Sequence, residues 1–162
     1  KIYIQTPIWI QMFIISNNRV TKIHEYPSLI LSKTWFGNSM QGEPCYSLET
    51  RAKRTLDELE DRHNYAISPV IIKNFSSHDL LIEQIFLRGD SFELYQGDKR
   101  IWTSETLISY RGKTKQSKVI IKENTPDEVG NIRPIGRSRV PQDKSFIAKT
   151  FTQLRQITQF DT

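Results

Sequence analysis

Apolar and polar residues alternate with a period of two over much of this chain, and that pattern constrains its fold more than any other feature. In residues 7–28, PIWIQMFIISNNRVTKIHEYPS, apolar side chains recur at every second position: Ile8, Ile10, Met12 and Ile14. Such alternation places them on one face of a β-strand. Asn17 and Asn18 follow, and because Asn tolerates positive φ the pair predicts a tight turn. The stretch therefore predicts a β-hairpin.

Further short strands follow at intervals of roughly 8–12 residues with no helical pattern between them. A buried strand is expected at 28–35, and in residues 45–52 alternation turns Tyr46, Leu48 and Ala52 inward. A Gly-Asp pair at 97–98 predicts a second hairpin turn. The remaining expected strands are 67–74, 79–88, 91–96, 100–111 and 117–123. This spacing predicts a mainly β fold, an antiparallel β-sandwich of jelly-roll type.

The period-two pattern of apolar residues stops near residue 123. Residues 123–143 hold three prolines and two glycines and predict a long loop. Over 144–160, Asp143 is a suitable N-cap and four apolar residues have helical spacing, namely Ile147, Phe151, Leu154 and Ile157. We therefore expect a single domain with a sandwich core at 1–122, a loop at 123–143 and one C-terminal α-helix at 144–160. Since Lys1 opens directly in strand-like sequence, the domain is expected to be truncated at its N-terminus.

Composition and residue spacing argue against a disulfide-stabilised fold, a zinc site and a membrane-spanning segment. The 162 residues include one cysteine, so no internal disulfide can form, and no Cys/His group has zinc spacing. The apolar stretch 2–15 is too short to span a membrane and is interrupted by polar residues and a proline. We expect no metal and no cofactor. The simplest compartment is the reducing cytoplasm, with membrane association left open.

The segment 35–47, WFGNSMQGEPCYS, contains the most distinctive loop. One interpretation is a ligand-facing loop, because tryptophan is a good binding anchor and exposed loops often carry function. The other is a structural corner between two strands, with Trp35 and Phe36 packed beneath it. The structural interpretation is favoured, and the candidate binding residues are Trp35, Phe36, Asn38, Gln41 and Glu43.

Cys45 is the single cysteine of the chain and so the one candidate cysteine nucleophile. A catalytic cysteine needs a lowered pKa, which a nearby histidine or a helix N-terminus usually provides. All three histidines lie far from Cys45 in the sequence. We therefore expect Cys45 to be a small buried side chain in a strand, and no catalytic residue is predicted. A Cys45-dependent hydrolase stays as the weakest alternative.

Positive charge gathers near the end of the chain. Residues 111–155 contain eleven of the 23 Lys and Arg residues but four of the 18 acidic ones. Arg133, Arg137 and Arg139 are spaced as in a flexible arm that contacts phosphates, which makes nucleic-acid binding an alternative function. Anionic lipid headgroups would satisfy the same charges. Because aromatic residues do not interleave with these cations, a solvated basic surface is the favoured interpretation.

The order of these segments resembles a bacterial family of unknown function, number four hundred and thirty-two. The resemblance covers nearly the whole chain and rests on these positions: Trp35, Phe36, Gly37, Gly42, Glu43, Cys45, Tyr46, Thr50, Arg51, Ala52, Ser68, Pro69, Val70, Ile72, Asn74, Trp102 and Thr103. The chain departs from the family pattern at Lys33, where an acidic residue is usual, and at Pro44, where leucine is usual. No activity is attached to this family, so the resemblance adds none to the expectation drawn from the residues. Members are often encoded beside small-conductance mechanosensitive channels, which implies an accessory role at a membrane protein.

Together these features predict a non-enzymatic binding or regulatory module. The expected partner is a protein, with a mechanosensitive channel or an anionic membrane surface as the candidates that the resemblance suggests. The expected contact surface is the 35–43 loop, the basic stretch 133–139, or both. Nucleic acid is the alternative partner, and the oligomeric state is left open.

Overall fold

The computed structural model describes residues 1–37, 40, 42–49, 52–82, 84–112, 117–122 and 126–140, and the backbone of 146–148. Over these residues the protein is mainly β, with one 3-10 turn at Gly89–Ser91. The strands are β1 Ile2–Pro7, β2 Trp9–Ser16, β3 Arg19–Pro27, β4 Ser32–Phe36, β5 Glu43–Ser47, β6 Tyr65–Asn74, β7 Leu94–Gln96, β8 Ile101–Thr103, β9 Thr106–Tyr110, β10 Ser117–Ile121, β11 Arg133–Gly136 and β12 Phe146–Ala148.

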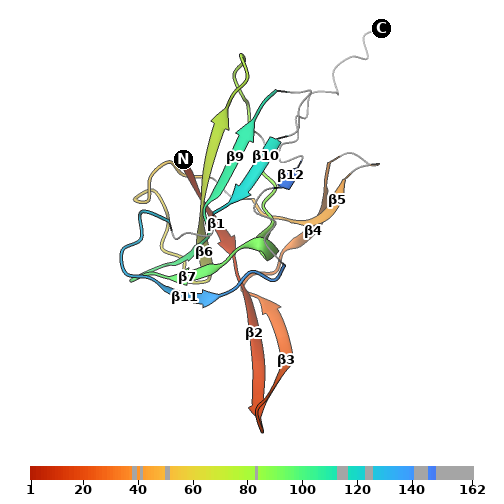
Figure 1. Ribbon diagram of the computed structural model, residues 1–162, viewed down its shortest axis with the longest axis vertical. Helices are drawn as coiled ribbons and strands as arrows, with labels where there is room; N and C mark the ends of the chain where they lie inside the picture. The colour runs from red at the N-terminus through yellow and green to blue at the C-terminus, as the bar shows by residue number, and fades with distance from the viewer. Residues whose placement is uncertain are drawn as a thin grey trace.

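Eight of these strands form one curled mixed sheet, in the order β11-β7-β8-β6-β9-β10-β12, with β1 also paired to β6. The other four form two separate two-stranded ribbons, β2–β3 and β4–β5. In Figure 1 the β2–β3 ribbon extends away from the body, and the β4–β5 ribbon extends from its side. The sheet therefore makes the body of the protein, and the ribbons project from it.

Strand β6 is the centre of the sheet. It pairs antiparallel with β1 along one edge and parallel with β8 and then β9 along the other. Between the pairs Ile67–Trp102 and Val70–Thr106 the register advances by one residue, which is a bulge at Ser104 and Glu105. Beyond the bulge the sheet divides, because β7 continues from β8 whereas β10 continues from β9. The bulge is thus where the sheet bends.

Both faces of the sheet carry a small apolar core. Alternation along β1 places Tyr3 on one face and Ile4 on the other. The first face holds Tyr3, Leu59, Ile67, Tyr95 and Trp102, covered by Leu56, Val129 and Ile132. The second face holds Ile4, Val70, Ile108 and Val119, with Ile2 and Ile72 of β1 and β6 beside them and Ile85 and Leu87 packed against them. Irregular segments around 56–59, 85–87 and 129–132 therefore supply part of the cover on the two faces.

Two features of this body differ from the sequence-based prediction. The antiparallel sandwich is not confirmed, since the eight-stranded sheet is mixed and its central strand has parallel neighbours. The predicted helix at 144–160 is wrong at 146–148, where β12 pairs antiparallel with β10, and the rest of that segment lies outside the described residues. In both cases the local pattern did not reveal which distant strand would supply the hydrogen bonds.

Several local predictions are confirmed. Residues 7–28 form the β2–β3 hairpin, and Asn17 and Asn18 have φ values of 47° and 60°, as a type I′ turn requires. The second hairpin joins β7 to β8, and the Gly97 N–H donates to the Arg100 carbonyl at 2.9 Å. The strand expected at 79–88 is wrong in its described part, which covers the second face of the sheet instead.

A chain of charged groups fastens the bulge to its surroundings. The Glu105 side chain is 3% exposed, and its carboxylate pairs with the ammonium groups of both Lys1 and Lys122. Lys1 also pairs with Glu128 at 2.6 Å, and Glu128 accepts a hydrogen bond of 2.7 Å from the Tyr3 hydroxyl. These contacts join β1, the bulge, the residue after β10 and the 126–132 loop.

This network also sets the charge state of Glu105. Burial by itself would raise the pKa of this carboxyl group, but the hydrogen bonds from Lys1 and Lys122 outweigh burial and hold the pKa below its usual value. The pKa of Glu128 is lowered as well, because burial is outweighed there by the hydrogen bonds from Lys1 and Tyr3. Both carboxylates therefore stabilise the folded state while ionised.

We expect the free energy of unfolding to fall as the pH drops below the unfolded-state pKa of about 4.3. A carboxyl group with a depressed folded-state pKa stabilises above that value and loses its contribution as the pH falls through the folded-state pKa. Glu105→Gln should lower the stability at neutral pH by about 2 kcal/mol and weaken its acid dependence. Urea unfolding at several pH values measures both. The exposed Glu49→Gln is the control, and an unchanged pH profile in Glu105→Gln would contradict the assignment.

Candidate functional site

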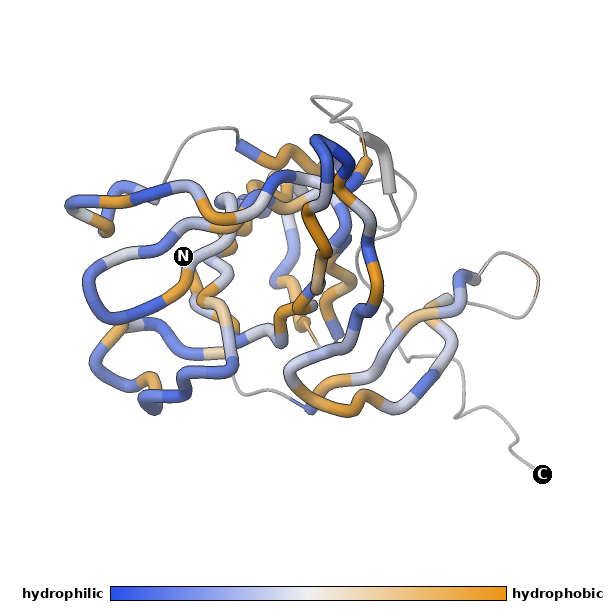
Figure 2. The backbone as a smooth tube through the Cα atoms, turned by 90° about the horizontal axis from the view of Figure 1, so that it is seen from below, coloured by the Kyte–Doolittle hydropathy of each residue, from blue (hydrophilic) through white to orange (hydrophobic). Residues whose placement is uncertain are grey.

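Large apolar side chains are unusually exposed on the β2–β3 ribbon. The fraction exposed ranges from 37% for Ile10 to 76% for Ile15. The exposed set on this ribbon is Trp9, Ile10, Met12, Phe13, Ile14, Ile15, Val20, Ile23 and Tyr26. Figure 2 shows hydrophobic stretches in peripheral segments of the chain as well as at its centre. Isolated exposed apolar residues are ordinary on a protein surface, but a contiguous set of this size is unusual.

Both faces of the β2–β3 ribbon are apolar. Cross-strand partners share a face, so one face carries the pairs Ile10–Tyr26, Met12–His24 and Ile14–Thr21. The opposite face carries the pairs Trp9–Pro27, Phe13–Lys22 and Ile15–Val20. A free two-stranded ribbon is only marginally stable in water, and strands that are apolar on both sides are typical of sheets covered on both sides. The ribbon therefore has the composition of a buried element in an exposed position.

Arg139 anchors the root of this ribbon to the body. Its guanidinium group pairs with the Glu25 carboxylate and lies 5.9 Å from the centre of the Trp9 ring. Its backbone N–H donates to the Asp90 carbonyl at 2.7 Å, which connects the same residue to the 3-10 turn. Glu25 also pairs with Lys22 at 2.9 Å, and this hydrogen bond is the main reason that the pKa of Glu25 is lowered. The root of the ribbon is thus held in a fixed direction.

The β4–β5 ribbon extends the apolar surface. Its pairs Trp35–Pro44 and Lys33–Tyr46 share one face, and Trp35 and Tyr46 are each about half exposed. The ring of Tyr46 lies 6.2 Å from that of Trp9 at an angle of 52°, so the two ribbons meet through an aromatic pair. We call the nine exposed side chains of β2–β3 together with Trp35 and Tyr46 the ribbon surface.

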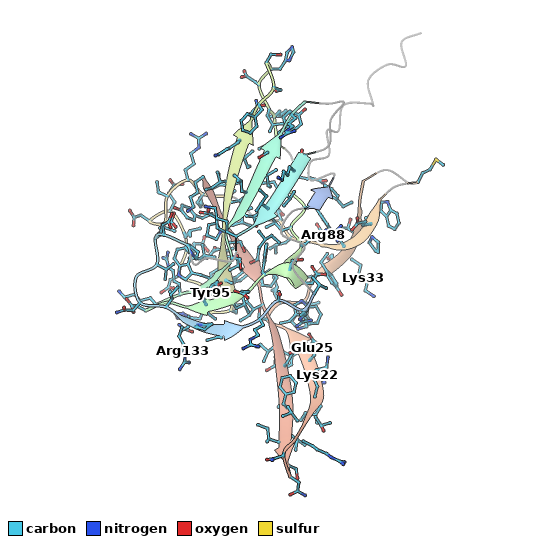
Figure 3. All side chains as sticks on the ribbon, in the orientation of Figure 1. Lys22, Glu25, Lys33, Arg88, Tyr95 and Arg133 are labelled. Atoms are coloured by element: carbon cyan, nitrogen blue, oxygen red, sulfur yellow. The ribbon has the colours of Figure 1, made fainter. Side chains whose placement is uncertain are left out.

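The other face of the β4–β5 ribbon attaches it to the body. Phe36 stacks on Phe86 with ring centres 5.0 Å apart, and the Arg88 guanidinium lies over the same Phe86 ring at 5.4 Å. Arg88 also donates to both oxygens of the Glu43 carboxylate at 2.9 Å each. Figure 3 shows Arg88 beside this ribbon, with Lys33 on it. Phe36 and Glu43 therefore position the ribbon.

The structure sorts the predicted loop residues into different roles. Phe36 and Glu43 face the body, whereas Trp35 contributes to the ribbon surface. Asn38 and Gln41 lie outside the described residues. The expectation that buried faces would account for Trp35 and Tyr46 is wrong, because both are about half exposed. The β4–β5 ribbon is a separate two-stranded unit among the described strands, and this face meets the β2–β3 ribbon through the Trp9–Tyr46 ring contact.

Cys45 lies in β5 opposite Thr34 and is partly buried. Burial raises the pKa of its thiol, and the nearby negative charge of Glu43 raises it further. Both effects disfavour the thiolate, which is the reactive form of cysteine. In the described part of the chain, no group of three or more His, Cys, Asp or Glu side chains is arranged to hold a metal ion.

The three arginines of the predicted basic arm do not act alike. Arg133 lies on β11 opposite Gln96 and is exposed, and Arg137 is also exposed. Arg139 instead forms an ion pair with the Glu25 carboxylate. Figure 3 shows Arg133 on the body, away from Lys22 and Glu25 on the hairpin.

Sequence reasoning missed the β2–β3 hairpin as a site. The alternation of Ile8, Ile10, Met12 and Ile14 indicated one buried face, and Trp9, Phe13 and Ile15 between them were not weighed. Between positions 8 and 15 Gln11 is the single polar residue. That near-continuous apolar run was the available signal.

The geometry therefore defines a mainly β protein whose curled mixed sheet carries two projecting ribbons with an exposed apolar surface. Residues 1–155 match the model of the family described as "Protein of unknown function (DUF432)", and the chain belongs to that family. No curated protein matches the chain, and no solved structure matches it. Within the described residues, no helix has the length and apolar character needed to cross a membrane.

We expect the Cys45 thiol to react with iodoacetamide at about pH 7 more slowly than a free cysteine, because its pKa is raised. Glu43→Gln removes the neighbouring negative charge and should speed the reaction, whereas the exposed Glu49→Gln should not. Mass spectrometry of quenched samples gives the rates. A rate above that of free cysteine would support the nucleophile alternative instead.

Arg139→Ala should loosen the root of the β2–β3 ribbon, because it removes the pair with Glu25 and the contact with Trp9. We expect faster backbone hydrogen exchange at 9–11 and 25–26 with little change in the central sheet. The matched control is the exposed Arg137→Ala. Equal exchange in the two variants would show that Arg139 does not anchor the ribbon.

Proposed function

We propose that this chain is a non-enzymatic binding module that engages a protein partner through the ribbon surface. The observation that supports this proposal most directly is the set of exposed apolar side chains on both faces of β2–β3. These nine side chains, three of them aromatic, form a contiguous exposed apolar set rather than isolated exposed residues.

The edges of the ribbon favour protein over lipid as the partner. Strands β2 and β3 pair only with each other among the described strands, so their outer backbone groups face away from the ladder. In hydrocarbon each unpaired backbone group costs several kcal/mol, and open sheet edges do not occur there. A protein partner satisfies these groups by adding a strand. An anionic membrane surface would attract the cations but would leave the apolar faces uncovered.

The family resemblance suggests which partner to test first. A mechanosensitive channel, the partner class that the resemblance implies, is a membrane protein whose exposed portion would meet the ribbon surface. Trp9, Trp35 and Tyr46 are suitable anchors, because aromatic residues are enriched at the centres of protein interfaces. On this proposal the curled sheet is the scaffold, and Arg139 and Arg88 hold the two ribbons in the direction that the partner requires.

A pull-down from solubilised membranes with the natural full-length protein tests the proposal. We expect a channel protein to be recovered, and recovery to be lost in the double variant Phe13→Ser/Ile15→Ser. The matched control is Phe75→Ser/Leu81→Ser, which removes two apolar side chains of similar exposure outside the ribbons. Equal recovery with both double variants would overturn the assignment of the surface. Recovery of nucleic acid instead, released by moderate salt and lost in Arg133→Ala/Arg137→Ala, would support the nucleic-acid alternative.

A further inference from the structure

The two outer edges of the β2–β3 ribbon are chemically different. The β3 edge has the features that proteins use to prevent unwanted strand pairing: a bulge opposite Met12 and Phe13, the cation Lys22 and the terminal Pro27. The β2 edge, with the sequence WIQMFIIS, has eight residues without a charge or a proline. An exposed, uncharged apolar strand of this length is a template for pairing with another strand.

We propose that the β2 edge pairs antiparallel with the β2 strand of a second copy of this chain. The result is a four-stranded sheet in the order β3-β2-β2-β3, built around a two-fold axis normal to the sheet. This inference rests on the proposed function, since it adds a second copy at one edge of the ribbon and leaves the apolar faces of the ribbon surface to the protein partner. It also accounts for the marginal stability of a lone ribbon, because three or more strands with an apolar face are needed for independent stability.

One register of the paired strands suits the sequence best. Under this symmetry residues of the same face lie opposite each other, and placing Met12 opposite Met12 of the second copy sets Ile10 against Ile14 and Trp9 against Ile15. Within residues 9–15, Gln11 against Phe13 is then the one kind of polar contact, and Ser16 falls opposite Ile8 at the end of the seam. The neighbouring register, with Phe13 on the axis, places Ser16 against Ile10 and Gln11 against Ile15. The Met12 register therefore matches more apolar side chains.

Charge and shape both favour a second copy as the occupant. The charged residues of the ribbon are all on β3, so pairing through β2 brings no like charges together and leaves a charged rim outside an apolar centre. Eight residues of strand span roughly 26 Å, and antiparallel pairing sets the two bodies at opposite ends of that length. Since the ribbon extends away from the body in Figure 1, the bodies do not obstruct the pairing.

The test uses two residues that are cross-strand partners on the same face of the ribbon but lie on opposite edges, Met12 and His24. Sedimentation analysis and light scattering of the chain should show a dimer. Met12→Lys places two like charges on the axis and should weaken dimerisation on the order of a hundredfold. The matched control His24→Lys should leave it unchanged, because β3 forms the outer edge.

Disulfide trapping locates the contact independently. In a Cys45→Ser background, Met12→Cys should form a cross-linked dimer under mild oxidation, because directly opposed strand residues lie close enough for a disulfide. His24→Cys should stay monomeric. A chain that is monomeric at all concentrations, or equal cross-linking through both positions, would overturn the inference. If the chain is monomeric and Phe13→Ser/Ile15→Ser still abolishes capture of the partner, the dimer is ruled out and the proposed function stands. If the dimer is intact but no partner is captured, only the proposed function is ruled out.

Discussion

The bulge at Ser104 and Glu105 is the feature on which the rest of the sheet depends. Because of the bulge, residues 101–110 run along β6 and pair with it on both sides of the bulge. The outer edge of the same stretch pairs with β7 before the bulge and with β10 after it. The cost is a carboxylate placed almost out of contact with water. Lys1 and Lys122 offset that cost, because a buried ion is tolerated when it is paired and hydrogen-bonded. The position of Tyr3 against Glu128, and so the cover of the first core face, follows from the same network.

The ribbons place much of the apolar surface of this small protein outside its core. The core consists of two clusters, one on each face of the sheet, and the ribbon surface holds more large apolar side chains than either. A chain that exposes this much apolar surface gains stability when something covers it, which is why binding dominates the functional interpretation. Arg139 and Arg88 are consistent with that role. Each holds the root of a ribbon through an ion pair, Arg139 with Glu25 and Arg88 with Glu43, and Arg139 also lies over the Trp9 ring of the ribbon surface.

Much of the local structure was predictable, whereas little of the site was. The Asn17-Asn18 turn, the Gly97 turn and the strands β6 and β10 all follow from patterns that neighbouring residues set. Trp35 was identified as a candidate anchor, but Tyr46 was expected to be buried and is not. Cys45 was expected to be a small buried side chain in a strand, and it lies in β5 but is only partly buried. The helix expected at 144–160 shows the limit most clearly, since residues 146–148 form a strand by pairing with β10.

The sequence by itself determined where the tight turns fall and, for β2, β3, β6 and β10, which residues extend as strands and which side chains share a face. Those properties depend on neighbours within a few positions, and backbone sterics and the pleat decide them locally. Only the tertiary structure decided which strands pair, in which direction, and whether an apolar face is covered. A period of two is the same whether a strand lies under a loop, at the centre of a mixed sheet or on an uncovered ribbon. The partner of each strand comes from residues far along the chain, and alternation carries no information about them.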